Sequence, residues 1–264
     1  MSRGRWVFAA GLVLLAAVAA MLWQENDPAW KTWQVRYNAE PGATPVAIAI
    51  RALTPTLTGK PELCVTCHVG IEQISASHPS ETFGCVVCHG GDPLALDAGR
   101  AHATMRGGHN PSDLSVASQS CGQANCHGGY ANEEQNHVDR VLKSLQATYA
   151  GGIASVRYTF GLQPSPLAQF GLYAIADADK KPPPKALVAV GAWKPITGTA
   201  EATFQQNCVE GGCHLGTLPA KPQPYYNRST GCAACHYLYA DDGLYRGSDP
   251  TIPHDQPGHG TVHR

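Results

Sequence analysis

The stretch that decides the fold is CVTCHVGIEQISASHPSETFGCVVCH, residues 64–89, in which two cysteine pairs are each followed at once by a histidine. The unit recurs three more times, so all ten cysteines fall into five pairs. The pairs are Cys64/Cys67, Cys85/Cys88, Cys121/Cys126, Cys208/Cys213 and Cys232/Cys235, followed by His68, His89, His127, His214 and His236. Because histidine occupies only 12 of 264 positions, this repetition indicates that the cysteine–histidine unit is itself the functional object.

The unit has the chemistry of a covalent haem site, in which two thiols form thioethers with the haem vinyl groups and the adjacent histidine binds the iron. CVTCH, CVVCH and CAACH have the ordinary spacing, whereas CGQANCH (121–127) and CVEGGCH (208–214) have two extra residues between the cysteines. Those residues can bulge outward without moving the second cysteine or its histidine. Disulfide loops and zinc sites are the alternatives, but neither requires a histidine after every second cysteine.

With these motifs the chain resembles a membrane-anchored pentahaem c-type cytochrome. The mixed spacings are similar to those of cytochromes of the c3 type, and SHPSETFGCVVCHGG (77–91) resembles segments of multihaem cytochromes that accompany quinol-oxidising membrane complexes. One anchor with five haems also resembles the pentahaem subunit of alternative complex III. The resemblance covers mainly 61–137 and 208–264. It implies a mostly irregular, short-helical multihaem cytochrome c fold built around stacked haems, with one N-terminal transmembrane helix.

Seven histidines lie outside the motifs and are candidates for the second axial ligand of the five haems. The favoured candidates are His78, His102, His137, His259 and His263, and the weaker ones are His109 and His254, together with Met105. For each histidine the alternative is a surface side chain, and Met105 is favoured to pack against a porphyrin face instead. His137 is expected on an amphipathic helix within 132–149, whose buried side would carry Val138, Val141, Leu142, Leu145 and Tyr149.

Residues 1–24, MSRGRWVFAAGLVLLAAVAAMLWQ, are predicted to form a transmembrane signal-anchor. Arg3 and Arg5 precede an uncharged run that is bracketed by Trp6 and Trp23, as interfacial anchors would bracket a span. A cleaved signal peptide is the competing interpretation. Both place the rest of the chain outside the cytoplasm, so the predicted location is a bacterial cytoplasmic membrane with the haem domain on its periplasmic side.

The predicted organisation after the anchor is a juxtamembrane linker (25–60) and one pentahaem domain (61–264). Three haems belong to 61–137, a cofactor-free insertion to 138–207, and two haems to 208–264. The span 61–137 is too short for an ordinary hydrophobic core beside three motifs, so the haems are expected to be its core. Within the insertion, LVAV (187–190) is expected to form a short strand.

The functional expectation is electron transfer without catalysis. Charged residues make up 15% of the chain and the formal net charge is −1, which argues against nucleic-acid binding. Five covalent haems would relay electrons from a quinol-oxidising membrane complex to other redox proteins. The alternatives are a multihaem reductase of a small oxyanion, against which the histidine in all five motifs argues, and a subunit of an extracellular haem filament.

Overall fold

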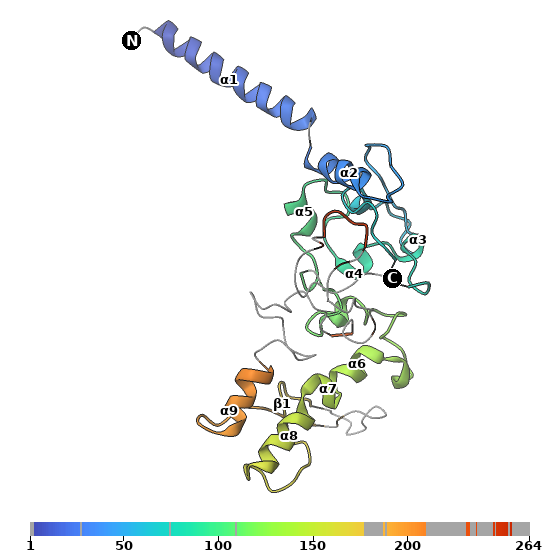
Figure 1. The fold of residues 1–264 in the computed structure, drawn as a ribbon, viewed down its shortest axis with the longest axis vertical. Coiled ribbons are helices and arrows are strands. Elements are labelled where there is room, and N and C mark those ends of the chain that lie inside the picture. Colours follow the sequence, from blue (N-terminus) through green and yellow to red (C-terminus); the bar gives the residue numbers. More distant parts are fainter. Residues whose placement is uncertain are drawn as a thin grey trace.

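The structure, a computed structural model, describes residues 3–26, 28–73, 75–108, 110–176, 187, 189–209, 231–232, 236, 245, 247–252 and 254. Helix α1 (Arg3–Asn26) projects from one end of an elongated molecule, and helices α6 (His137–Leu142) to α9 (Ala200–Phe204) lie at the other end (Figure 1). The first three cysteine–histidine motifs lie in the part between them. The described chain is therefore organised along one axis that begins at α1.

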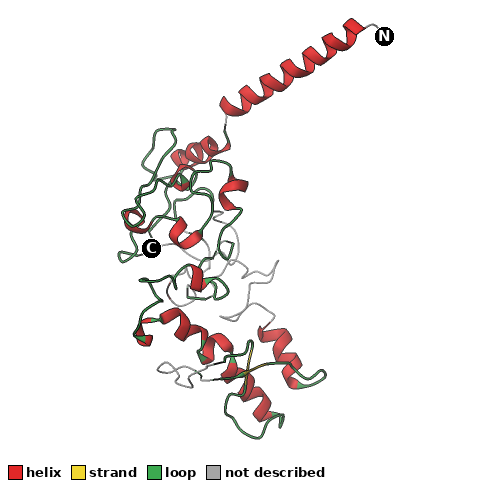
Figure 2. Cartoon of the chain, turned by 180° about the vertical axis from the view of Figure 1, so that it is seen from behind, coloured by secondary structure: helices red, strands yellow, loops and turns green. Residues whose placement is uncertain are grey.

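The other elements are short and are joined by turns, as Figure 2 shows. They are α2 (Ala29–Ala39), η1 (Cys64–Thr66), α3 (Ser80–Phe83), α4 (Val86–His89), α5 (Ala98–His102), η2 (Ala117–Gln119), η3 (Glu133–Gln135), α7 (Leu145–Thr148), α8 (Ala150–Thr159), the parallel strands β1 (Phe170–Gly171) and β2 (Gly191–Ala192), and the π-helical turn η4 (Gln205–Val209). The predicted short-helical, irregular chain with one long apolar N-terminal helix is confirmed in this coarse form.

Helix α1 contains one segment, Gly4–Leu22, that is long and apolar enough to cross a membrane, with a mean hydropathy of 2.1 over 19 residues. Its apolar side chains are exposed along its length, for example Val7, Val13 and Leu15. A secretory signal sequence has the same length and composition near the N-terminus. The helix therefore fits both interpretations of residues 1–24.

Helix α2 lies within the stretch that was predicted to be a linker, and it docks on the first cysteine–histidine motif. The Gln34 amide donates to the carbonyls of Ala49 (2.7 Å) and Thr66 (2.9 Å) and accepts from the Ala49 N–H (2.9 Å). Trp30 is buried on the same helix. Helix α2 docks through hydrogen bonds from a Gln side chain to a distant backbone. Such a contact leaves no periodic pattern of apolar residues in the sequence, so the docked face of α2 was not predicted.

The single helix predicted over 132–149 is wrong, because the segment forms three pieces, η3, α6 and α7. The Ser144 hydroxyl accepts from the Ala147 N–H (3.1 Å) and so begins a new helix after α6. The helix α7 then ends at Tyr149, whose φ is 57°. Val138 is buried as predicted, whereas Leu145 is 46% exposed. The predicted strand LVAV is shifted: Val190 pairs with Ile175 in an isolated bridge, and the strand itself is β2, directly after it.

The segment predicted to be an insertion without cofactor (138–207), together with Val209 just after it, has a hydrophobic core. One cluster groups Ala150, Ile175 and Val190, and a second groups Ile153, Trp193 and Val209. In contrast, the side chains most deeply buried between residues 61 and 137 are largely polar, namely Glu62, Thr66, Ser112, Asp113 and Ser120. The two parts of the chain are thus held together by different interactions.

A buried ion pair joins α8 to α9 beside the second cluster. The Glu201 carboxylate, fully buried, accepts from Arg157 (2.5 Å), from the Trp193 indole N–H (2.9 Å) and from the Ile196 N–H (2.8 Å). Burial raises the pKa of Glu201, but these donors together outweigh it and lower the pKa below its ordinary value. The carboxylate is therefore charged and holds three segments at one point.

Replacement of Glu201 by alanine leaves the Arg157 charge and two N–H donors without their acceptor. We expect the Glu201→Ala variant to destabilise the packing of α8 on α9 by about 3–5 kcal/mol, since removing one partner strands a buried charge. Hydrogen exchange of the backbone amides in 150–209, followed by mass spectrometry, measures this loss locally. Thr203→Ala, at an exposed position of the same helix, is the matched control, and equal protection in both variants would contradict the assignment.

Candidate functional site

The described cysteine–histidine motifs share one local geometry. The backbone N–H of the histidine donates to the backbone carbonyl of the first cysteine in the motif. The distance is 3.0 Å for His68, 2.9 Å for His89, 3.0 Å for His127 and 3.0 Å for His236. The bond is the same in the stretched motif, CGQANCH, as in the motifs with ordinary spacing. There the additional length is taken up by a loop in which Asn125 has a φ of 65°. The two extra residues are thus accommodated without loss of the hydrogen bond between the His127 backbone N–H and the Cys121 carbonyl.

Thiols of different motifs lie close together in the structure. The six cysteines of the first three motifs all carry free thiols. The thiols of Cys64 and Cys85 form a hydrogen bond, which lowers the pKa of Cys64 and raises that of Cys85. The first and second motifs are therefore in contact. Burial, and then the charges of Cys121 and Cys126, raise the pKa of Cys88 to about 11, which indicates that the second and third motifs are neighbours.

The fifth motif joins the third rather than standing apart. The Cys232 N–H donates to the Ser112 carbonyl at 3.2 Å, just ahead of the third motif. A hydrogen bond from the Cys232 side chain lowers the pKa of the Cys121 thiol to about 6. The first, second, third and fifth motifs therefore form one continuous series in space. Cys213, His214 and Cys235 lie outside the described residues.

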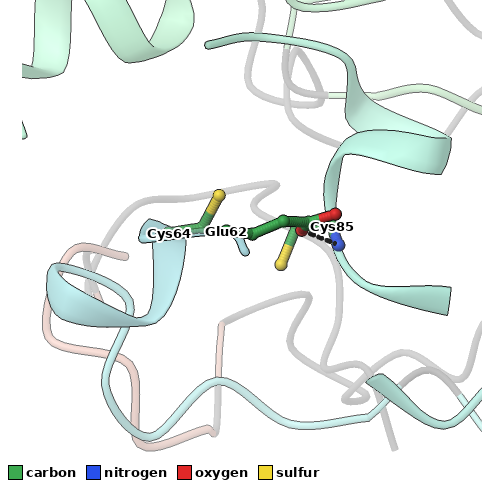
Figure 3. A group of neighbouring side chains, drawn as sticks. All are labelled: Glu62, Cys64 and Cys85. Atoms are coloured by element: carbon green, nitrogen blue, oxygen red, sulfur yellow. Dashed lines mark hydrogen bonds between the residues drawn. The ribbon is translucent and has the colours of Figure 1, made fainter. Parts of the chain in front are cut away.

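Glu62, which is 1% exposed, connects the first motif to the second. One carboxylate oxygen accepts from the backbone N–H groups of Cys85 (2.6 Å) and Val86 (3.3 Å) at the start of α4. Figure 3 shows the side chain reaching the Cys85 nitrogen, with the thiols of Cys64 and Cys85 beside it. The two sulfurs and a carboxylate oxygen lie within 4.8 Å of one another, which is the spacing of a possible metal-ion site.

Histidine rings from outside the motifs approach two of the motif histidines. The ring centres of His68 and His102 are 6.0 Å apart, those of His127 and His78 are 6.0 Å apart, and those of His127 and His137 are 5.7 Å apart. Two imidazoles on opposite sides of one metal ion, with metal–nitrogen bonds of about 2 Å, have ring centres about 6 Å apart. The rings of His78, His102 and His137, three of the predicted second ligands, thus lie beside a motif histidine at a spacing that one metal ion between two imidazoles would require.

His68 has a carboxylate partner that is distant in the sequence. Its Nδ1 lies 2.8 Å from the Asp249 Oδ2 and 3.0 Å from the Thr251 hydroxyl. Burial disfavours protonation of the ring, but the hydrogen bond and the charge of Asp249 outweigh it and raise the pKa of His68. With Nδ1 engaged in this way, Nε2 is the nitrogen left to bind a metal ion, an arrangement that is usual for metal-ligating histidines.

The remaining predicted ligands lie elsewhere or outside the described residues. Met105 pairs with Gly90 in an isolated bridge and its side chain packs near Gly91, directly after the second motif. His254 is exposed, in an open groove with Arg36 and Glu40 beside α2. His109, His259 and His263 fall outside the described residues, so these three stay predictions.

Asp249 and Glu62 are the two residues of this region that sequence reasoning missed. Glu62 stands two positions before Cys64 in a chain with few charges, which is a weak local signal that could have marked it. Asp249 is 181 positions from His68 and had no such signal. Comparison with known protein families, curated proteins and solved structures finds no match for this chain.

The contact between α2 and the first motif can be tested at Gly70, whose φ is +86° and where a Cβ would lie 2.4 Å from the Tyr37 ring. We expect Gly70→Ala to lower stability by about 1 kcal/mol for the left-handed backbone. Overlap of the Cβ with the Tyr37 ring and with the Ser248 carbonyl, 2.8 Å away, should cost a further 1–3 kcal/mol or so. Thermal unfolding of the detergent-solubilised full-length chain, followed by circular dichroism, provides the measurement.

Gly59→Ala is the matched control for this variant, since Gly59 has a φ of +63° but open space where the Cβ would be placed. Gly59→Ala should lower the stability only by the cost of the left-handed backbone, about 1 kcal/mol. Adding Tyr37→Ala to Gly70→Ala should recover part of the additional loss. Equal effects of Gly70→Ala and Gly59→Ala would mean that α2 does not dock on the first motif.

Proposed function

We propose that the protein is a membrane-anchored electron carrier with five covalently bound c-type haems. The observation that carries this proposal is that His68 and His127, each closing a cysteine–histidine motif, have a second imidazole at the spacing of one shared metal ion. When bound, haem iron supplies one-electron redox chemistry. The cysteines of the five motifs would hold the haems, and the motif histidines would be the proximal ligands.

The residues present fit this cofactor. The thiols of the first three motifs are free, as thioether formation requires. The Asp249 contact holds the His68 ring with Nε2 left for the iron. His102, His127 and His137 have exposed side chains that a flat group can reach. On this basis we propose that His102 would bind the same iron as His68, and that His78 or His137 would bind the same iron as His127.

The series of motifs supports a relay of electrons in place of a single redox centre. The first motif contacts the second through Cys64 and Cys85, and the third contacts the fifth through Cys121 and Cys232. Between them, the Gln123 amide donates to the Val87 carbonyl at 2.6 Å and so joins the third motif to the second. Haems held at these positions would be close neighbours in space.

The position of α2 supports an electron donor in the membrane. Only Asp27 and Pro28 separate α1 from α2, and α2 is anchored to Thr66 within the first motif. If α1 spans a bacterial cytoplasmic membrane, the first motif lies next to its outer surface. We therefore propose a quinol-oxidising membrane complex as the donor and a redox protein on the periplasmic side as the acceptor.

The haem count is the direct test of this function. We expect the full-length protein purified from a host with a haem c maturation system to carry five haems per chain, by pyridine haemochrome absorbance against protein mass. Intact mass spectrometry should give the same number. The double variant Cys121→Ser/Cys126→Ser should carry one haem fewer. Three haems in the unaltered protein would mean that the two stretched motifs are empty.

Ligation by His102 gives a second expectation. In His102→Ala, one haem should lose its sixth ligand and change from low-spin to high-spin, while all haems stay attached through their thioethers. Absorbance and electron paramagnetic resonance spectra of the oxidised protein report this change. His254→Ala, in the groove beside α2, is the control and should stay fully low-spin. A high-spin haem already present in the unaltered protein would favour the small-oxyanion reductase instead.

A further inference from the structure

We propose that Asp249 is a positioning residue that lowers the reduction potential of the haem bound by His68. This inference rests on the proposed function, because it concerns the haem of the first motif. It assigns a role to a buried carboxylate that belongs to no motif. It also distinguishes the haem of the first motif from that of the third.

The contact between Asp249 and His68 fixes the state of the imidazole. Asp249 is fully buried, and its Oδ2 lies 2.8 Å from Nδ1 of His68. A carboxylate oxygen only accepts hydrogen bonds, so the proton of the ring is on Nδ1. Nε2 is then the unprotonated nitrogen, and its lone pair is the one that binds iron. The carboxylate therefore selects the tautomer that ligation needs.

The Asp249 carboxylate is itself held in place from both sides. Its Oδ1 accepts from the Thr251 N–H at 2.9 Å, and its own N–H donates to the Tyr245 hydroxyl at 3.0 Å. The Tyr245 hydroxyl in turn donates to Glu72 at 2.8 Å, and Glu72 also accepts from the Ser248 N–H. Glu72 follows the first motif by four residues. The segment around Asp249 is thus clamped to the motif that it serves.

Two effects of this carboxylate act in the same direction on the iron. An imidazole that donates its Nδ1 proton to a carboxylate is a stronger electron donor at Nε2, which stabilises the oxidised iron. A negative charge buried near the iron also favours the more positive oxidation state, because a low local dielectric strengthens the attraction. Both effects lower the reduction potential of the haem at His68.

The third motif has a different environment. The rings next to His127 are those of His78 and His137, with ring centres 6.0 and 5.7 Å away. Among the described residues, no carboxylate pairs with the His127 ring. Removal of the Asp249 charge should therefore act on one haem and leave the haem at His127 as it was.

The test compares Asp249→Asn with the unaltered full-length protein, both solubilised in detergent. The amide keeps an oxygen acceptor of nearly the same shape and removes the negative charge. The haem count of both proteins is measured first, by pyridine haemochrome. Spectroelectrochemical titration then resolves the redox components. We expect five haems in both proteins and a shift of one component to more positive potential, with the other four unchanged.

Two further variants sharpen the result. Tyr245→Phe keeps the Asp249 charge but removes the hydroxyl that accepts from the Asp249 N–H, so it should shift the potential of the same haem by less. This variant replaces Asp249→Asn in the test if Asp249→Asn does not fold with five haems. Asp139→Asn removes an exposed charge that pairs with Lys143 at 2.9 Å, and it should shift nothing. Five haems with unchanged potentials in Asp249→Asn would reduce Asp249 to a structural tether. An unaltered protein without haem would overturn the proposed function, and this inference with it.

Discussion

The interaction on which the described motifs depend is the hydrogen bond from the histidine N–H to the carbonyl of the first cysteine. It closes each motif into one compact turn and fixes the histidine backbone relative to the first cysteine, in the stretched motif CGQANCH as in those with ordinary spacing. The stretched motif CGQANCH keeps this bond by placing Asn125 in a left-handed conformation. The number of residues between the cysteines therefore changes only the loop, and the histidine backbone keeps the same hydrogen bond in each described motif.

The chain combines two kinds of folding unit that obey different rules. The insertion buries aliphatic and aromatic clusters and one ion pair between Arg157 and Glu201, as an ordinary small domain does. The motif region buries polar side chains that bond to distant backbone: Glu62 accepts from the N–H of Cys85 in the second motif, and the Thr66 hydroxyl donates to the Arg51 carbonyl. Order in the motif region thus comes from directed polar contacts, and in the insertion from the removal of apolar surface from water.

Sequence reasoning reached the features that are local and repeated, and it failed where a contact is distant or polar. The five motifs and the apolar helix α1 follow from short patterns, and His78, His102 and His137, which lie beside motif histidines in the structure, were candidates because histidine has few other uses in this chain. The break at Ser144 was missed because the spacing of apolar residues over 132–149 fits one helix, whereas the Ser144 hydroxyl caps a new one. Gln34 and Asp249 were missed because their partners lie 32 and 181 positions away, a separation that no local window covers.

The separation between His68 and Asp249 has a consequence for how the protein is assembled. The first motif is synthesised 181 residues before its carboxylate partner. Closure of a loop of this length carries an entropic cost, which the contacts of Glu72, Tyr245 and Asp249 offset only once that partner has been made. The surroundings of the first motif are consequently completed only after the second and third motifs and the residues 150–209 have been synthesised.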